Sequence, residues 1–360
     1  MSKILVVGAG GLGCEVIKNL VLYGCQSITI VDPDTIEIHN LSHQLLYRLE
    51  DCGHPKAKVA AERVNALGRV TTASYISSYI EDVPIRTIAS FGVIVTTVDN
   101  FPSRRWINMV ICIIQGLYKK SCTGTSIPLL IDCGSQELFG HVRVDAYNSC
   151  SLPNEPQFPE DCVRYILTQN WDYAGLFDNP RLDRGKLLER LLQESQEYAQ
   201  THGICQVTRG VVTEVLKRPI ANISTTNSII AAIALSIISM KDMEGNYYFY
   251  SGHGDTVLDA FLLEKQKDCM MCNSSILLVK ASKSDTLEKF LMSIIAVLGG
   301  DGICVSSRKG TLYMGCDPML RDLYSYRLTK TIGELQDIID EVLYVTCKGL
   351  NSWCSVYIEF

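Results

Sequence analysis

The chain has 360 residues, a net charge of −6 and an apolar content of 47%, enough for two or three domains with sizeable cores. Its neighbouring basic residues, such as Arg104 and Arg105, form isolated pairs and no basic stripe, so nucleic acid is not an expected partner. The most apolar run, 228–240, is shorter than the roughly 20 residues that cross a bilayer, so we expect no membrane partner either.

Targeting signals and cysteine usage both indicate a reducing compartment. The amino terminus enters an apolar strand directly, without the regions of a secretory signal, which predicts an intracellular protein of the cytoplasm or nucleus. The 15 cysteines lack the spacing of a disulfide framework, and most are expected to be buried thiols. Three of them, Cys150, Cys269 and Cys272, are candidates for chemistry.

A glycine-rich turn follows the first apolar strand and precedes a helix. Gly8, Gly10 and Gly13 have the G-x-G-x-x-G spacing, which permits a tight turn, lets backbone approach a phosphate and allows close packing of helix on strand. The next apolar strand, 27–31, ends in Asp32, at about the spacing expected for an acceptor of ribose hydroxyls. These features predict a Rossmann-like nucleotide-binding domain, and on their own they favour an NAD-dependent dehydrogenase.

The residues that follow do not suit a dehydrogenase. Residues 32–48 and 53–57 resemble the D-x-D-x-I-x-x-x-N-L-x-R-Q-x-L-x-R and G-x-x-K-A signatures of the activating enzymes for ubiquitin-like proteins. The resemblance implies that the nucleotide is ATP.

The same resemblance assigns roles to individual residues. Asp32 would hold the ribose, Asn40 and Lys56 would reach the phosphates, and Gln44 and Arg48 would shape the pocket. The alternative for Lys56 is a solvated lysine at a helix start. The complete set assigned to the nucleotide is Gly8, Gly10, Gly11, Gly13, Asp32, Asp34, Asn40, His43, Gln44, Lys56 and Asp99.

His43 departs from the signature, which has arginine at this position. Arginine is always charged and can bind phosphate in a bidentate manner, whereas a histidine near pH 7 is often neutral. Our hypothesis is that this substitution weakens ATP binding and makes it more favourable at mildly acid pH, unless a partner subunit supplies the missing cation.

Asp99 ends a buried parallel-type strand that begins at residue 93 and precedes a helix with the sequence Arg-Arg-Trp-Ile-Asn. The carboxyl ends of such strands are where open α/β sheets bind ligands. In the resembled family the corresponding aspartate helps to hold Mg²⁺, which neutralises ATP so that a carboxylate can attack the α-phosphorus. The alternative for Asp99 is a helix N-cap.

Residues 150–166 resemble the active-site segment of the same family, in which a nucleophilic cysteine precedes a small hydroxyl residue, a proline-containing loop and a second cysteine. On this register Cys150 is the nucleophile, Ser151 replaces the usual threonine and Cys162 is structural. A thiol can displace AMP from an acyl-adenylate, which makes a thioester. The charged, leucine-bearing segment 184–200 is predicted to be a helix that completes a small insertion around Cys150.

Cys269 and Cys272 form one CxxC, which supplies only two of the four ligands of a structural zinc site. The resembled family has a second CxxC upstream of its nucleophile, and this sequence has none there. An occupied zinc site and two free thiols therefore stand as equal alternatives.

The rest of the chain has two parts. Segment 207–273 resembles the family's return into the adenylation sheet, with a buried helix beginning near residue 223 and antiparallel strands at 247–250 and 257–263. For the final part we predict strands, two helices with capping-box starts at Asp285/Glu288 and Thr331/Glu334, and a likeness to the ubiquitin-like domain that recruits the conjugating enzyme. Its predicted elements are strand 276–281, helix 286–298, short strands near 304 and at 311–315, helix 332–342 and strand 354–360.

Taken together, the resemblance predicts an α/β protein with a Rossmann-like, ThiF-type adenylation domain (1–146 and 207–273), a helical catalytic-cysteine insertion (147–206) and a carboxyl-terminal ubiquitin-like β-grasp domain (274–360). It implies ATP and Mg²⁺, a ubiquitin-like modifier, a conjugating enzyme and an adenylation-inactive partner subunit in a heterodimer. The strings Arg-Arg-Trp-Ile-Asn and Thr-Arg-Gly-Val-Val favour the neddylation branch over the sumoylation branch. A catalytically impaired scaffold and, more distantly, an NAD-dependent oxidoreductase are the rival interpretations.

Overall fold

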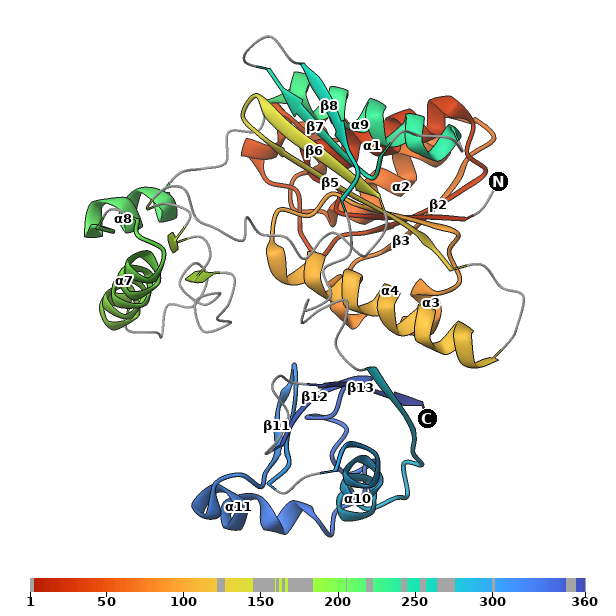
Figure 1. Ribbon diagram of the computed structural model, residues 1–360. Helices are drawn as coiled ribbons and strands as arrows, with labels where there is room; N and C mark the ends of the chain where they lie inside the picture. The colour runs from red at the N-terminus through yellow and green to blue at the C-terminus, as the bar shows by residue number, and fades with distance from the viewer. Residues whose placement is uncertain are drawn as a thin grey trace.

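A large sheet flanked by helices forms the main body of the protein, with a helical lobe to one side and a smaller carboxyl-terminal unit beneath it (Figure 1). The computed structural model describes residues 3–121, 127–144, 159, 162–163, 166–167, 184–204, 206–217, 223–240, 245–252, 257–263, 276–299, 302–347 and 354–359.

The large sheet has eight strands in the order β3-β2-β1-β4-β5-β6-β7-β8. The first five are parallel neighbours, and β6, β7 and β8 continue the sheet in antiparallel fashion. The parallel strands are joined through helices, which parallel pairing requires. The bounds are β1 Ile4–Val7, β2 Ser27–Val31, β3 Thr72–Ile76, β4 Val93–Thr96, β5 Leu129–Gln136, β6 Phe139–Val144, β7 Tyr247–Ser251 and β8 Leu258–Phe261.

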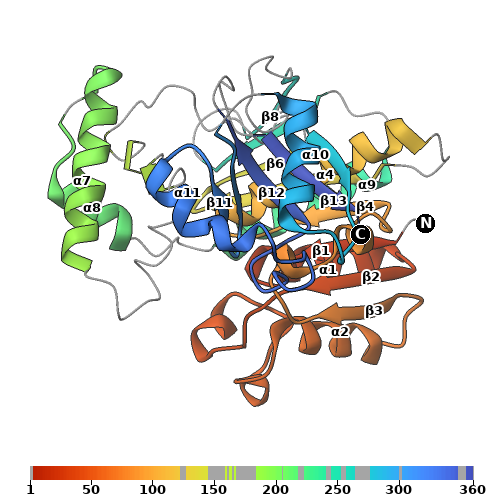
Figure 2. The ribbon, with the colours of Figure 1, turned by 90° about the horizontal axis from the view of Figure 1, so that it is seen from below.

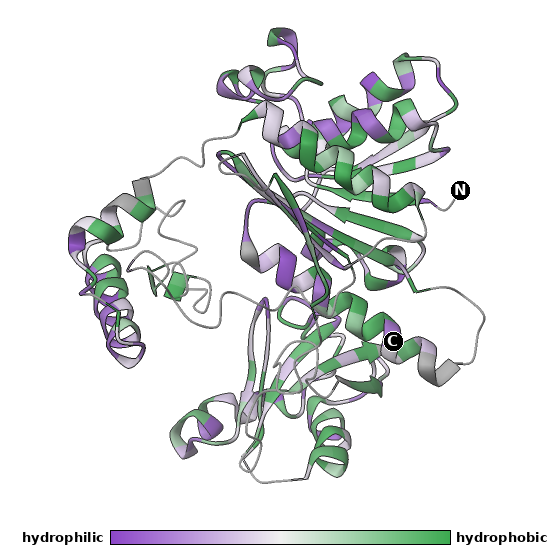
Figure 3. Ribbon diagram, turned by 45° about the horizontal axis from the view of Figure 1, so that its top comes forward, coloured by the Kyte–Doolittle hydropathy of each residue, from purple (hydrophilic) through white to green (hydrophobic). Residues whose placement is uncertain are grey.

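Helices cover both faces of the parallel half of the sheet. Successive side chains of a strand point to opposite faces, and the apolar side chains on both faces have to be buried. In β1, Ile4 and Val6 join the core that α1 (Gly11–Tyr23), α2 (Lys56–Ala66) and α9 (Ser224–Ser239) share. Leu5 and Val7 join the core on the other face, under α3 (Ile85–Ile88) and α4 (Phe101–Ser121). The central strands of this half, β1 and β4, are accordingly hydrophobic along most of their length, as the green ribbon there shows (Figure 3).

The carboxyl-terminal unit contains a five-stranded sheet in the order β11-β10-β12-β13-β9. Only β13 and β9 pair in parallel. One side of the sheet packs on α10 around a separate apolar core. The bounds are β9 Ile276–Lys280, α10 Leu287–Leu298, β10 Cys304–Ser307, β11 Gly310–Met314, α11 Pro318–Tyr324, β12 Val342–Thr346 and β13 Cys354–Glu359.

The two sheets are docked through α4, as the view from below shows (Figure 2). Val342 and Tyr357 of the smaller sheet are buried in the same core as α4. The Glu341 carboxylate accepts a hydrogen bond from Ile85 N–H at 2.9 Å, and the Ser355 hydroxyl contacts Met109 Sδ at 3.5 Å. The carboxyl-terminal unit therefore has a defined position on the main body.

The helical lobe consists of α7 (Arg184–Thr201) and α8 (Arg209–Lys217). Buried side chains of Leu191 and Val212 pack there with Cys162 and Val163. The helix predicted over 184–200 is confirmed, and Cys162 is buried in this core, as expected of a structural cysteine.

Two predictions for the carboxyl-terminal unit are wrong. Residues 332–338 form turns in place of the predicted helix, and β12 begins at Val342. The Thr331 and Glu334 capping contacts do form, but no further helix follows, and Ile332, Leu335 and Ile339 join the core of the unit. The cap of α10 is Thr286, whose hydroxyl accepts from Lys289 N–H at 3.3 Å, and not Asp285. Helix α11 was not expected.

Candidate functional site

The glycine turn between β1 and α1 has the geometry that its sequence predicts. Gly8 has a φ of +99°, and Gly13 lies so close to it that an added Cβ would be 2.1 Å from the Gly8 carbonyl oxygen. Gly10 caps α1 without a side chain, and nothing lies within 4 Å of the place where its Cβ would be. Helix α1, which begins at Gly11, therefore presents its amino end to open space suited to an anion.

The Asp32 carboxylate holds this turn. One carboxylate oxygen accepts from Ala9 N–H at 2.6 Å and the other from Asp34 N–H at 2.8 Å. The side chain is buried, and burial raises its pKa against the opposing effect of the two N–H groups. Each oxygen keeps a further acceptor site for a hydroxyl group.

Lys56 is the first residue of α2 and is buried, so the interpretation as a solvated lysine is wrong. Its ammonium group donates to the Asp34 carboxylate at 2.8 Å. The Asp34 side chain is 61% exposed, which leaves this ion pair open to exchange with a ligand.

The segment after Asp34 carries three polar side chains of the predicted site, of which His43 lies close enough to Lys56 to feel its charge. Asn40 is buried in a short 3-10 helix, Ile38–Ser42, where its amide oxygen accepts from Glu37 N–H at 2.8 Å. His43 contacts Gln44 at 3.4 Å, and burial, followed by the charges of His39 and Lys56, lowers the pKa of His43.

Gln44 carries the clearest sign of a missing ligand. The side chain is only 4% exposed, and its amide oxygen has no hydrogen-bond partner among the described residues. Leaving such an acceptor unpaired costs about 1–3 kcal/mol, and a polar ligand would satisfy it.

Tyr47 is a residue of this site that sequence reasoning missed. Its buried hydroxyl donates to the Ala9 carbonyl at 2.7 Å and also lies 3.3 Å from the Lys56 carbonyl. It therefore connects the glycine turn with the start of α2. The sequence motif could not predict this role, because Tyr47 occupies a position at which the resembled signature accepts any residue.

Two further predicted residues, Arg48 and Asp99, are exposed. Arg48 is exposed and lies beside Glu50, so the structure does not bring it into the pocket. Asp99 is exposed just beyond β4. The interpretation of Asp99 as a helix N-cap is wrong, because Asn100 accepts the hydrogen bond from Ser103 N–H at 2.9 Å.

A buried ion pair supports the neighbouring strands. Arg104 of α4 contacts the Asp132 carboxylate of β5 and also donates to the carbonyls of Val98 and Cys133. Thr96 of β4 donates to the same carboxylate. Burial acts to raise the pKa of Asp132, but Arg104 and the hydrogen bonds outweigh it and hold that pKa well below its usual range.

Three of the predicted residues, Cys150, Cys269 and Cys272, lie outside the described residues. Within the described ranges, no group of three or more histidine, cysteine, aspartate or glutamate side chains is arranged to hold a metal ion. The same ranges contain no helix that is long and apolar enough to cross a membrane.

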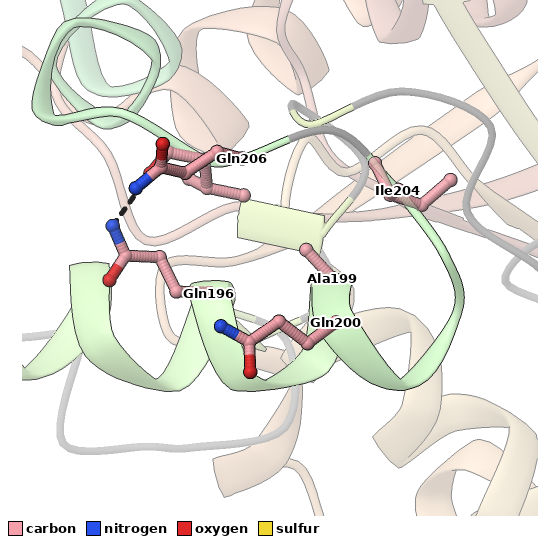
Figure 4. Close-up of a pocket in the computed structure, with 6 residues that line it drawn as sticks. Gln196, Ala199, Gln200, Ile204 and Gln206 are labelled. Atoms are coloured by element: carbon pink, nitrogen blue, oxygen red, sulfur yellow. Dashed lines mark hydrogen bonds between the residues drawn. The ribbon is translucent and has the colours of Figure 1, made fainter.

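A separate hollow lies in the helical lobe and not at the glycine turn (Figure 4). It is lined by Gln196, Ala199, Gln200, Ile204, Gln206 and Val207.

The mixed sheet, the glycine turn and the cluster of Asp32, Lys56 and Gln44 define a nucleotide-binding α/β protein of the Rossmann-like class. Comparison with protein families matches residues 1–271 to the ThiF family. The chain belongs to this family and, within it, to the NEDD8-activating enzyme E1 catalytic subunits.

The second assignment rests on relatives that match nearly the whole chain. The NEDD8-activating enzyme E1 catalytic subunit of Schizosaccharomyces pombe is 30% identical over 99% of this chain and 90% of its own length. The Caenorhabditis elegans protein of the same name is 32% identical over 81% and 74%. Escherichia coli MccB, solved with MccA-N7isoASN, shares the fold at a TM-score of 0.50 and 15% identity, over 75% of this chain and 67% of its own. The family resemblance seen in the sequence is thereby confirmed.

Proposed function

We propose that this chain activates a ubiquitin-like modifier of the NEDD8 type. In this function the chain uses ATP to adenylate the terminal carboxylate of the modifier, takes the modifier as a thioester and passes it to a conjugating enzyme. The observation that carries the proposal is the 30% identity to a NEDD8-activating catalytic subunit over 99% of this chain.

The cluster at the glycine turn suits ATP. The amino end of α1 and the ammonium group of Lys56 would face the phosphates, and Asp32 would hold the ribose. The amide oxygen of Gln44, which none of the described residues satisfies, offers an acceptor for a polar ligand group. ThiF-family adenylating enzymes use ATP and Mg²⁺. Asp99, which is exposed beyond β4, is the residue we assign to Mg²⁺, which would supply charge neutralisation.

Two displacement steps follow from these assignments. The modifier's carboxylate oxygen attacks the α-phosphorus of ATP, so that an acyl-adenylate forms and pyrophosphate leaves. Lys56, together with the N–H groups at the start of α1, stabilises the negative charge of the phosphates. The Cys150 thiolate then attacks the acyl carbon, and AMP leaves as the thioester forms.

We further propose that residues 1–146 and 207–273 form the adenylation domain, residues 147–206 the cysteine insertion and residues 274–360 the carboxyl-terminal domain. Support for a ubiquitin-like β-grasp domain that recruits the conjugating enzyme comes from the five-stranded sheet packed on α10. Support for a heterodimer with an adenylation-inactive subunit comes from the relatives' name, catalytic subunit.

Cys269 and Cys272 either bind zinc or remain as two free thiols. Cys269 and Cys272 supply half of a tetrahedral site. Metal analysis of the purified protein under reducing, chelator-free conditions distinguishes one bound zinc per chain from two free thiols.

The first experiment is a non-reducing gel of the chain, co-expressed with its partner subunit and incubated with Mg²⁺-ATP and candidate modifiers. We expect an ATP-dependent adduct that thiols release and that Cys150→Ala abolishes. Cys316→Ala, which removes an exposed thiol of the carboxyl-terminal unit, is the matched control and should keep the adduct.

The same gel distinguishes the second candidate function. If the partner binds but no adduct forms with any modifier, the chain is a catalytically impaired scaffold of the same family. His43 in place of arginine at the nucleotide site is the observation that favours this alternative.

A further inference from the structure

Two thiols lie together at one end of the smaller sheet. Cys304 begins β10 and is 8% exposed, whereas Cys316 follows β11 and is exposed. The backbone N–H of Cys316 donates to Cys304 Sγ at 3.4 Å. Burial and, after it, the neighbouring Cys316 side chain raise the pKa of Cys304.

The strand pairing explains why the two thiols meet. Cys304 pairs with Met314, and the next residue, Gly315, donates its N–H to the Ile303 carbonyl at 2.7 Å. The chain after β11 is thus held across the start of β10. Gly302 allows this approach, because an added Cβ would lie 3.2 Å from Cys316 Cα and its φ is +72°.

We propose that Cys304 and Cys316 are a redox pair that a small-molecule disulfide, such as oxidised glutathione, converts into an intramolecular disulfide. The exposed Cys316 thiolate attacks one sulfur of the oxidant, which forms a mixed disulfide and releases one reduced thiol. Cys304 then gives up its proton and attacks the Cys316 sulfur, which releases the second reduced thiol. The protein loses two protons and two electrons, and the oxidant gains both.

The disulfide would act on α11. Asp317, next to Cys316, caps this helix by accepting from the N–H groups of Met319 and Leu320 at 2.8 and 3.2 Å. The side chains of Met319 and Leu323 on the helix are 81% and 62% exposed. Linking Cys316 to the buried Cys304 therefore anchors the start of a helix that presents apolar groups to solvent.

The test is peptide mapping of the full chain after incubation with oxidised glutathione and alkylation of the remaining thiols. Trypsin cleaves after Arg308 and Lys309, which separates Cys304 in peptide 290–308 from Cys316 in peptide 310–321. We expect the two peptides to be linked in most molecules, and the Met319 and Leu320 amides to exchange several-fold more slowly. Excess dithiothreitol should reverse both effects.

Variants identify the pair independently of the catalytic thiol. Cys316→Ser, at an exposed position, should abolish the linked peptides and the slower exchange, whereas Cys52→Ser, at a half-buried thiol outside this unit, should leave both. Cys304→Ala should stop the reaction at glutathione on Cys316, and native-like hydrogen exchange of this variant would establish that it is folded. Stable glutathione on Cys316 of the parent chain, linkage of Cys316 to another cysteine, or no reaction would each overturn the proposal.

Discussion

At the scale of single residues, Tyr47 shows how one hydroxyl group joins two parts of a binding site. The Ala9 peptide is held from both sides, by Asp32 at its N–H and by Tyr47 at its carbonyl. Because Tyr47 also approaches the Lys56 carbonyl, it relates the glycine turn to the lysine. Its influence on the nucleotide would be exerted through these groups.

We predict that Tyr47→Phe raises the KM for ATP about fivefold, with kcat unchanged, since a lost hydrogen bond costs about 1 kcal/mol and Tyr47 acts on the nucleotide only through Ala9 and Lys56. ATP–pyrophosphate exchange measures both constants. Tyr248→Phe is the matched control, because its buried hydroxyl donates to the Gly245 carbonyl at 3.0 Å in another part of the sheet. Equal KM values in the two variants would contradict a positioning role.

His43 gives a prediction about pH. Burial, the largest cause, and the nearby charges of His39 and Lys56 lower its pKa, so the imidazole stays neutral to more acid pH than an ordinary histidine. The gain in ATP affinity expected on protonation is therefore displaced to below a pH of about 6.5. We predict that KM for ATP is flat from pH about 8 to about 6.5 and falls only below that.

Replacing His43 with arginine tests the same position with a side chain that is charged at every pH of interest. His43→Arg should lower the KM for ATP across the whole pH range, measured by pyrophosphate exchange, because guanidinium does not titrate there. His202→Arg, at an exposed histidine after α7, is the control for added charge. No change in KM for His43→Arg would mean that His43 does not face the phosphates.

At the scale of elements, the Arg104–Asp132 pair joins α4, β4 and β5. Both side chains are largely buried, at 16% and 6% exposed. Removing one partner of such a pair leaves an uncompensated charge, which costs about 3–5 kcal/mol. The pair therefore stabilises the edge of the sheet at which Asp99 lies.

We predict that Asp132→Asn lowers the free energy of unfolding by about 3–5 kcal/mol near neutral pH, as urea titration would measure. The folded-state pKa is below the unfolded value, so the contribution is complete above a pH of about 4 and is lost as the pH falls further. Parent and variant should thus converge in acid. Glu62→Gln, which removes a charge from an exposed pair with Lys58, is the control and should lower the free energy of unfolding by less than about 1 kcal/mol. If the free energy of unfolding of the parent and of Asp132→Asn had the same pH dependence, ionised Asp132 would not be the source of this stability.

At the scale of the whole molecule, the Arg308 side chain links the carboxyl-terminal unit to the main body. From the hairpin of β10 and β11 it donates to Asp82 at 2.7 Å, to the Glu81 carbonyl at 3.1 Å and to Asp340 at 3.2 Å. Its guanidinium also lies 5.6 Å from the ring centroid of Trp106 on α4. One side chain thus contacts both units.

We predict that Arg308→Met loosens this docking, because the hydrogen bonds to Asp82 and to the Glu81 carbonyl, which cross the junction, would be lost. Hydrogen exchange of the Ile85 amide, which donates to Glu341 across the same junction, should become at least tenfold faster. Arg321→Met, an exposed arginine of the same unit, should leave it unchanged. Unchanged exchange in both variants would mean that the apolar contacts with α4 hold the junction alone.

Short-range motifs were sufficient to predict much of this protein. The glycine turn, Asp32, Asp34 and Lys56 follow one another within the first βαβ elements, where neighbours in sequence are also neighbours in the fold. Strands of the core were recognised by their continuous apolar runs. For the same reason the family and its nucleotide could be inferred from residues 3–57.

Only the tertiary structure decided the contacts that join distant segments. Tyr47 meets Ala9 across 38 residues, and Arg104 meets Asp132 across 28. The capping contacts of Thr331 and Glu334 predicted a helix that the fold does not contain. Local patterns report local backbone preference, whereas the partner of a buried hydroxyl, carboxylate or thiol depends on which strands and helices pack together.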